Sequence, residues 1–383
     1  MRLTATADPA TLSLSQKLRQ INWSFVFIVC LIAGIGLAML YSAGNGHVSP
    51  WASRQAIKFA AALTLMICVA LVDIRIWLRY AYWFYFIALG LVTAVDVIGV
   101  VGMGAQRWLH LGFFQIQPSE VMKVSLILAL ARYFHGAMPE DTGRPTYLIL
   151  PIMMVMAPVA LVLKQPDLGT AMMLLLMAGA MFFLAWVRLW MFGIVIALAG
   201  GAGPLAWKFL KPYQKDRIFT FLDPESDPLG AGYHILQSKI ALGSGGLFGK
   251  GFLLGTQSHL NFLPEKQTDF IFTMLAEEMG IAGGLGLIAL YGLIVILGFA
   301  LSLKVRSQFG RLVGLGVTTT FFLYVFINIA MVMGLIPVVG VPLPLISYGG
   351  TALITIMAGF GLLLSASIHR NVRIGRYGAT DEV

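Results

Sequence analysis

A decapeptide in the middle of the chain, LPEKQTDFIF (residues 263–272), combines two carboxylates and a lysine with an apolar run. Glu265, Lys266 and Asp269 come directly before the apolar residues FIF. A carboxylate set among cations and bordered by apolar side chains can take a proton from a substrate as a general base, and Asp269 is our candidate for that role. The alternative is a loop ion pair between Asp269 and Lys266 that carries no chemistry.

A second pair of opposite charges lies in the segment QPSEVMK (residues 117–123). Pro118 suits the first turn of a helix, and Glu120 and Lys123 then stand three residues apart, close enough to pair on one helix face. Charge inside an apolar helix is costly, so the pair is a candidate for contact with substrate. A self-neutralised pair that only holds helices together is the alternative.

Further charged residues precede or follow apolar segments on what we expect to be one side of the protein. Lys164 and Asp167 lie in KQPDLGT, Arg107 lies in GAQRWLHLG, and Arg217 lies in YQKDRIFTF. Arginine suits bidentate contact with phosphate, although arginines beside aromatic residues also serve as interfacial anchors. Together with Lys123 these cations predict a site for an anion at the membrane surface, whereas an ordinary loop turn is the alternative for KQPDLGT.

The composition identifies the elements that must position these residues. Of 383 residues, 58% are hydrophobic and 11% are charged, and the mean hydropathy is +0.85. Apolar runs of roughly 20 residues predict an all-α polytopic membrane protein rather than a barrel. The ten expected spans are 22–42, 55–73, 78–100, 119–136, 147–164, 168–187, 189–208, 281–303, 311–334 and 347–368.

Basic residues set the expected orientation. The positive-inside rule makes the side that is richer in lysine and arginine cytoplasmic. The side with the termini carries Arg2, Lys17, Arg19, Arg75, Arg79, Arg132, Arg144, Arg188, Lys304, Arg306, Arg311, Arg370, Arg373 and Arg376, and the short opposite loops carry Arg54, Arg107 and Lys164. We therefore expect cytoplasmic segments at 1–21 and 369–383, a membrane domain at 22–368, and an external loop at about 209–280 between spans seven and eight.

A proline- and glycine-interrupted stretch, GLIPVVGVPLPLISYGGTA (residues 334–352), separates the last two expected spans. Irregular backbone at membrane depth is tolerated where protein or a water-filled cavity satisfies its polar groups. We expect this stretch to line such a cavity, with Ser347 as a candidate contact to substrate.

Four of these motifs, QPSEVMK, KQPDLGTA, LPEKQTDFIFTMLAEEMG and GLIPVVGVPLPLISYGG, occur in the order that resembles the SEDS family of shape, elongation, division and sporulation proteins. The resemblance runs from the first span to the tenth. The forms VPLPLISYGG and FTMLAEE are more similar to the elongation branch than to the division branch. In the family the aspartate of TDFIF is essential, and it falls on Asp269 here. The other family positions fall on Glu120, Lys123 and Asp167, and Gln267 replaces a common histidine.

The resemblance implies a peptidoglycan glycosyltransferase that polymerises lipid II at the outer face of the bacterial inner membrane with inversion at the sugar. It implies as partners lipid II and the nascent glycan, a class B penicillin-binding protein, and the elongation proteins MreC, MreD and RodZ. A divalent cation, Mg or Mn, is a candidate cofactor that would join the cations at the diphosphate. Nucleic acid is not an expected partner.

Three alternatives remain open from the sequence. A lipid II flippase or transporter also predicts ten spans with intramembrane charge, but it should place its carboxylates near the middle of the membrane. A scaffold that recruits the transpeptidase predicts that no single carboxylate matters for polymer formation. A division-type polymerase of the same family is the third.

Overall fold

The computed structural model describes residues 13–102, 105–110, 112, 115–138, 140–209, 215, 219–223, 231–259, 265–372 and 374–375. The described chain is mostly helical, which confirms the expected polytopic α-helical fold. The helices are α1 (Leu14–Gln20), α2 (Trp23–Ala43), α3 (Trp51–Leu71), α4 (Ile74–Ile98), α5 (Pro118–His135), η2 (Asp141–Gly143), α6 (Pro145–Lys164), α7 (Leu168–Leu184), α8 (Leu189–Phe209), α10 (Ala231–Ser244), α11 (Thr256–His259), α12 (Ile271–Leu303), α13 (Gln308–Val332) and α14 (Thr351–Ile368).

Each of the ten expected spans falls on one long helix, α2 to α8 and α12 to α14. Within the described residues, seven helices are long and apolar enough to cross a membrane: α2, α3, α4, α6, α12, α13 and α14. Helix α7 is a shorter apolar helix, and α5 carries Glu120, Lys123 and Arg132. The count of ten spans and the domain boundaries therefore stay predictions.

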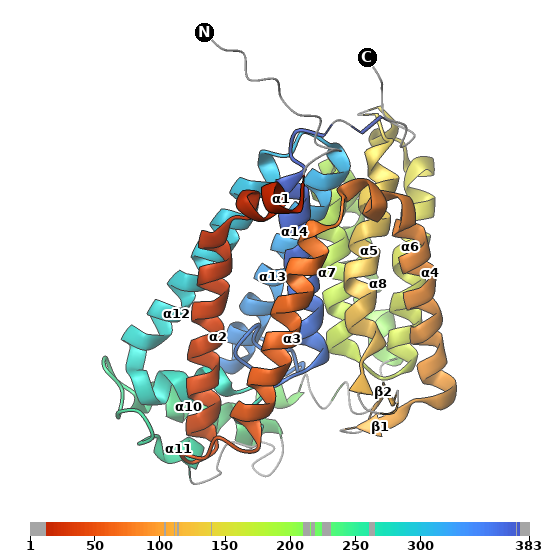
Figure 1. Ribbon diagram of the computed structural model, residues 1–383. Helices are drawn as coiled ribbons and strands as arrows, with labels where there is room; N and C mark the ends of the chain where they lie inside the picture. Colours follow the sequence, from red (N-terminus) through yellow and green to blue (C-terminus); the bar gives the residue numbers. More distant parts are fainter. Residues whose placement is uncertain are drawn as a thin grey trace.

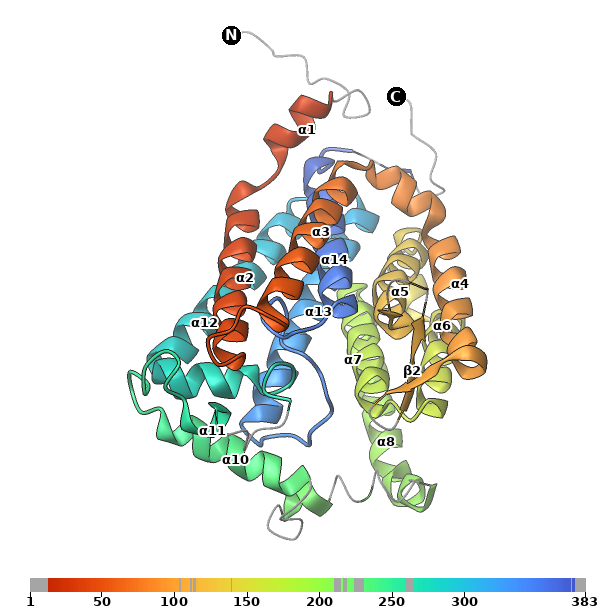
Figure 2. The same ribbon diagram turned by 60° about the horizontal axis from the view of Figure 1, so that its bottom comes forward.

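Different elements lie at the two ends of the bundle. Helix α1 and the last turn of α14 lie at one end, whereas α10, α11 and the short strands β1 and β2 lie at the opposite end (Figure 1). Viewed toward that second end, α10 and α11 lie beside the chain that joins α13 to α14 (Figure 2). The chain therefore enters and leaves the bundle at the same end, as an even number of spans requires.

Helices α13 and α14 form the centre of the bundle. In each of them 72% of the apolar window is buried within the protein, against 28% in α3 and in α4. Helix α13 contacts α5, α7, α12 and α14. Residues at both ends of α13 can therefore touch several elements at once, while α3 and α4 present much of their apolar surface outward.

Helix α12 is interrupted at Gly280, whose φ of 71° and ψ of −170° are not helical. A side chain there would strike the backbone of Gly249 and Leu247, at 2.4 and 2.5 Å from an ideal Cβ, so only glycine fits. The amides of Ile281 and Ala282 donate to the carbonyls of Gly246 and Leu247. The glycine-rich turn between α10 and α11 is thus fixed onto α12. The straight part of α12 begins at residue 281, where the sequence predicted a span to start.

A small antiparallel sheet was not predicted. Strands β1 (Val100–Gly102), β2 (Ala105–His110) and β3 (Gln115–Ile116) follow α4 in the order β1-β2-β3. Strands β1 and β3 are too short to show the alternation that marks a strand in sequence, and the six residues of β2, AQRWLH, do not alternate. Their consequence for the site is that β2 carries Arg107.

Candidate active site

A cavity of about 210 Å³ lies at the end of the bundle that carries β2. Strand β2, the first turns of α5, α7 and α14, helix α13 and the stretch 334–352 all contribute to its lining, which confirms that this stretch lines a cavity. The polar and charged lining residues are Arg107, Gln117, Glu120, Lys123, Asp167, Thr170, Thr268, Asp269, Tyr324, Tyr348 and Thr351. Segments from several parts of the chain therefore meet around one cavity.

Asp269 lies in a turn at residues 265–270, here called the TDF turn, whose backbone is held from two sides. The Ser347 hydroxyl donates to the carbonyl of Thr268 at 2.6 Å, and the Tyr348 amide donates to the carbonyl of Gln267 at 2.8 Å. The Asn328 side chain on α13 donates to the carbonyl of Asp269 at 3.0 Å and to that of Val341 at 2.7 Å. These bonds fix the backbone of the carboxylate without using its oxygens.

The space in front of the Asp269 carboxylate is kept open by Gly340. This glycine has a φ of 71°, and a Cβ added to it would lie 3.5 Å from Oδ2 of Asp269. A larger residue would therefore be strained and would also narrow the approach to the carboxylate. Gly340 thus leaves room beside this oxygen.

The environment of Asp269 raises its pKa. Burial is the largest cause, the charge of Glu265 adds to it, and the Arg107 guanidinium opposes it, so that the pKa rises from 3.8 to about 6. A carboxyl with this pKa is mostly ionised at neutral pH and yet accepts a proton more readily than an ordinary aspartate. That is the property required of a general base working near neutral pH.

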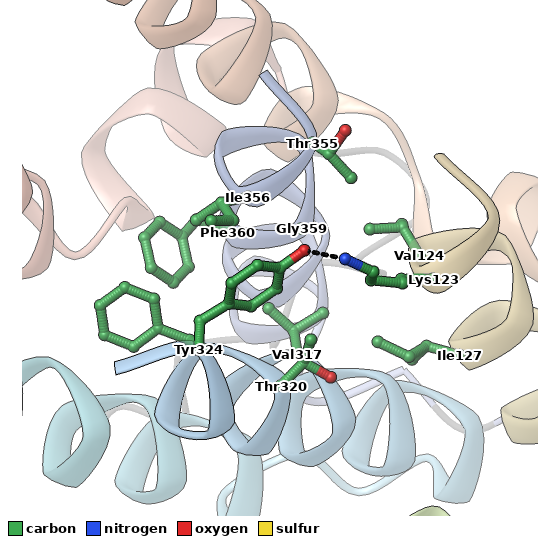
Figure 3. Close-up of a pocket in the computed structure, with 11 residues that line it drawn as sticks. Lys123, Val124, Ile127, Val317, Thr320, Tyr324, Thr355, Ile356, Gly359 and Phe360 are labelled. Atoms are coloured by element: carbon green, nitrogen blue, oxygen red, sulfur yellow. Dashed lines mark hydrogen bonds between the residues drawn. The ribbon is translucent and has the colours of Figure 1, made fainter. Parts of the chain in front are cut away.

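Glu120 and Lys123 form the pair that the sequence predicted. The Lys123 Nζ lies 2.6 Å from Oε1 of Glu120, and both side chains are buried. The Tyr324 hydroxyl on α13 donates to Oε2 of Glu120. The same hydroxyl accepts from Nζ of Lys123 (Figure 3). The pair is therefore a three-residue cluster, and Lys123 within it lines the cavity.

Arg107 and Asp167 form a second pair in the cavity wall. The Arg107 Nε lies 3.3 Å from Oδ2 of Asp167. Asp167 is also the N-cap of α7, because its carboxylate accepts from the amide and the hydroxyl of Thr170 at 3.1 and 2.8 Å. The buried Nε of Arg107 has no aligned acceptor within the described residues. The guanidinium of Arg107 is thus held beside Asp167 in the cavity wall.

The charge of the described lining is not net positive, so the site for an anion expected from the sequence stays a prediction. Arg107 and Lys123 face Glu120, Asp167 and Asp269, so two cations stand against three carboxylates. Among the described residues no three His, Cys, Asp or Glu side chains are grouped so as to hold a metal. The lining thus offers individual N–H donors, without excess positive charge or a protein ligand set for the divalent cation.

Comparison with known proteins identifies the family. The sequence profile of the cell cycle proteins FtsW, RodA and SpoVE matches residues 18–372. The chain belongs to this family. Peptidoglycan glycosyltransferase MrdB of Escherichia coli (strain K12) is 42% identical over 348 residues, which are 91% of this chain and 94% of the relative.

Two solved structures agree with this assignment. Rod shape determining protein RodA of Thermus thermophilus has a TM-score of 0.68 at 30% identity, covering 91% of this chain and 97% of that chain. A chain described under "Structural coordination of polymerization and crosslinking by a peptidoglycan synthase complex" has a TM-score of 0.81 at 33% identity, covering 91% and 98%. The SEDS resemblance predicted from the four motifs is confirmed.

The structure of this SEDS protein separates the predicted site residues into three groups. Asp269, Glu120, Lys123, Arg107 and Asp167 line the cavity, and Ser347 supports the TDF turn from behind. Lys164 is not among the lining residues, since its Nζ bridges Asp96 at 3.2 Å and its side chain is 74% exposed. Arg217 lies outside the described residues.

Two residues that the sequence analysis did not single out, Tyr324 and Asn328, are central to the site of this SEDS protein. Both are buried on α13, one helical turn apart. Polar side chains inside an apolar helix are costly unless they are paired, and this signal could have found them. Tyr324 contacts the Glu120 and Lys123 pair, whereas Asn328 holds Asp269, so α13 connects the two halves of the site.

Proposed function

We propose that the chain is a peptidoglycan glycosyltransferase that polymerises lipid II during cell elongation. Its similarity to MrdB over most of both chains supports this activity. The observation that carries it at the level of residues is Asp269, a partly buried carboxylate with a pKa of about 6 in a cavity that also presents Arg107 and Lys123.

Asp269 acts as the general base in this proposal. Its carboxylate accepts the proton of the C4 hydroxyl on the terminal N-acetylglucosamine of the acceptor. The hydroxyl oxygen forms the new bond to the anomeric carbon of the growing chain, and the bond from that carbon to the diphosphate breaks on the opposite face. The products are a glycan longer by one disaccharide, with inversion at the sugar, undecaprenyl diphosphate, and a proton on Asp269.

Negative charge develops on the diphosphate as it leaves, and donors fixed near that position stabilise the transition state. Arg107 and Lys123 supply N–H groups to the same cavity as Asp269. Because the lining carries no excess positive charge, a divalent cation, Mg or Mn, accompanying the diphosphate stays part of the proposal. The described residues offer it no ligand set of three or more His, Cys, Asp or Glu side chains.

The proposal places the cavity at the outer face of the bacterial inner membrane, with both termini in the cytoplasm. Its support is the excess of basic residues on the side of the termini. A reporter active only outside the cytoplasm should therefore work when fused near Ser258 and fail when fused near Gln308. Activity at Gln308 alone would reverse the orientation.

The proposed partners are a class B penicillin-binding protein and the elongation proteins MreC, MreD and RodZ, in addition to lipid II. The similarity to a chain of a peptidoglycan synthase complex supports the first of these. Co-purification of the full chain with its penicillin-binding protein tests this association directly.

The decisive experiment incubates the purified chain with labelled lipid II, with and without the penicillin-binding protein, and separates the products by size. Wild-type protein should form glycan strands, and Asp269→Asn should form none. Removal of a general base lowers the rate by about a hundred- to ten-thousandfold. Strands from Asp269→Asn at near the wild-type rate would refute the base, whereas no strands from wild type in complex would favour the flippase or the scaffold.

A further inference from the structure

The Tyr324 hydroxyl closes a ring of hydrogen bonds with Glu120 and Lys123 in the interior of the bundle. The three residues are 2%, 4% and 3% exposed. Glu120 uses one carboxylate oxygen for Lys123 and the other for Tyr324, and the hydroxyl of Tyr324 both donates and accepts. Each carboxylate oxygen and the hydroxyl are therefore satisfied inside the cluster.

The ammonium of Lys123 is not fully used by this cluster. A lysine ammonium has three N–H donors, and within the described residues Lys123 donates to Glu120 and to Tyr324. One donor therefore remains, and Lys123 lines the 210 Å³ cavity that contains Asp269. This leaves a single N–H for an oxygen of whatever occupies the cavity.

Lys123 and Tyr324 also line a second, smaller cavity of about 20 Å³, which Figure 3 shows. The surroundings of the smaller cavity are largely apolar. Its two threonine hydroxyls, from Thr320 and Thr355, donate to carbonyls of their own helices at 2.8 Å. The Tyr324 hydroxyl is thus the polar group that contacts the Lys123 ammonium at the edge of this apolar cavity.

These observations give Tyr324 a role in the reaction although it is not itself a reacting group. We propose that Tyr324 is a positioning residue, which holds the ammonium of Lys123 so that its remaining N–H donates to a diphosphate oxygen of the lipid-linked substrate. Tyr324 acts through Lys123, and the inference rests on the proposed function because the diphosphate belongs to that substrate.

Tyr324→Phe deletes the hydroxyl and keeps the ring, which lies 4.5 Å from Nζ of Lys123. The measurement is the dissociation constant of undecaprenyl diphosphate for the purified full chain, together with KM and kcat for lipid II. A hydrogen bond to a charged group corresponds to about a ten- to hundredfold change, so we expect binding weaker by at least about tenfold. The unfolding temperature reports separately on any loss of structure.

A double-mutant cycle with Lys123→Met separates positioning from a structural effect. If Tyr324 acts through Lys123, then Tyr324→Phe should not weaken binding further once the ammonium is gone. Additive losses would overturn the proposal. Tyr85→Phe is the matched control, because its buried hydroxyl donates at 2.9 Å to the carbonyl of Met154, away from the cavity, and binding should stay at the wild-type value.

Tyr324→Phe could fail to fold because Glu120 loses a donor in the protein interior. In that case Tyr324→Phe is made in a Glu120→Gln background, where no buried carboxylate is stranded. The double variant should still bind undecaprenyl diphosphate more weakly than Glu120→Gln alone. The positioning role is refuted if these two proteins bind undecaprenyl diphosphate equally well, or if Tyr324→Phe binds it as tightly as wild type, provided that the wild-type protein is active. If wild type neither binds undecaprenyl diphosphate nor polymerises lipid II, the proposed function itself fails.

Discussion

Replacing Asp269 by asparagine should produce a protein that is inactive and more stable than wild type. Burial and the charge of Glu265 hold the pKa of Asp269 at about 6 instead of 3.8. The folded protein therefore carries the ionised carboxylate at a cost that the unfolded chain does not have. Asparagine has nearly the same shape and no charge, so this cost disappears in the variant while the three bonds to the backbone of the TDF turn remain.

The size of the effect follows from the two pKa values. The difference between 6 and 3.8 is 2.2, which at about 1.36 kcal/mol each gives an upper limit of about 3 kcal/mol in the free energy of unfolding. Asp269 is partly exposed, and solvent screening lowers this figure. We expect Asp269→Asn to be more stable by about 1 to 3 kcal/mol at neutral pH.

The sign of this difference in stability follows from its pH dependence. Below pH 3.8 the carboxyl is protonated in both states and the cost is absent. Between pH 3.8 and about 6 the folded state binds more protons than the unfolded state, so stability falls as pH rises, and above about 6 the cost is complete. The advantage of Asp269→Asn should therefore be largest above pH 6 and about half as large near pH 5.

The assay is thermal unfolding of the purified proteins in one detergent and at one heating rate, near pH 7.5 and near pH 5, because membrane proteins often unfold irreversibly. Glu140→Gln is the control, since Glu140 is an exposed carboxylate outside the cavity and its loss should leave the unfolding temperature unchanged. An Asp269→Asn protein that unfolds at or below the wild-type temperature near pH 7.5 would refute the electrostatic argument for this residue.

Three further predictions concern the same site. The wild-type kcat/KM should rise about tenfold per pH unit up to about pH 6 and then level off. Glu265→Gln should move this inflection to lower pH, because it removes a charge that raises the pKa of Asp269. An unmoved inflection in the pH–rate profile would contradict this prediction. Glu120→Gln with Lys123→Met should be as inactive in polymerisation as either single variant while still inserting into the membrane; recovered activity would mean that the pair is only structural. Asn328→Ala should lower kcat by about tenfold or more by releasing the backbone of Asp269, measured by lipid II polymerisation, and an unchanged kcat would show that this bond does not position the base.

The sequence by itself determined the membrane class, the family and the identity of the proposed base. Apolar length is a local property, so the helices could be placed before any contact was known. The pair of Glu120 and Lys123 was also predictable, because a spacing of three residues on one helix fixes their distance. Asp269 stood out because a carboxylate directly before an apolar run is unusual in a chain with 11% charged residues.

Tertiary structure alone decided which charges face one another. The sequence grouped Lys164 with Asp167, yet Lys164 bridges Asp96 on α4 and Asp167 meets Arg107 on β2. The sequence also could not show that Arg107 and Lys123, two cations of the predicted anion site, each pair with a carboxylate. Such pairings depend on residues brought together by packing of distant segments, which no local pattern encodes.

The contribution of α13 has the same origin. In the sequence Tyr324 and Asn328 are two polar residues in an apolar helix, and their spacing says only that they share a face. The structure places that face between α5 and the TDF turn, so that one residue reaches Glu120 and the other the backbone of Asp269. Hydrogen bonds between segments separated by 204 and 59 residues are set by the packing of the whole bundle, and they complete a site whose reacting group the sequence had already indicated.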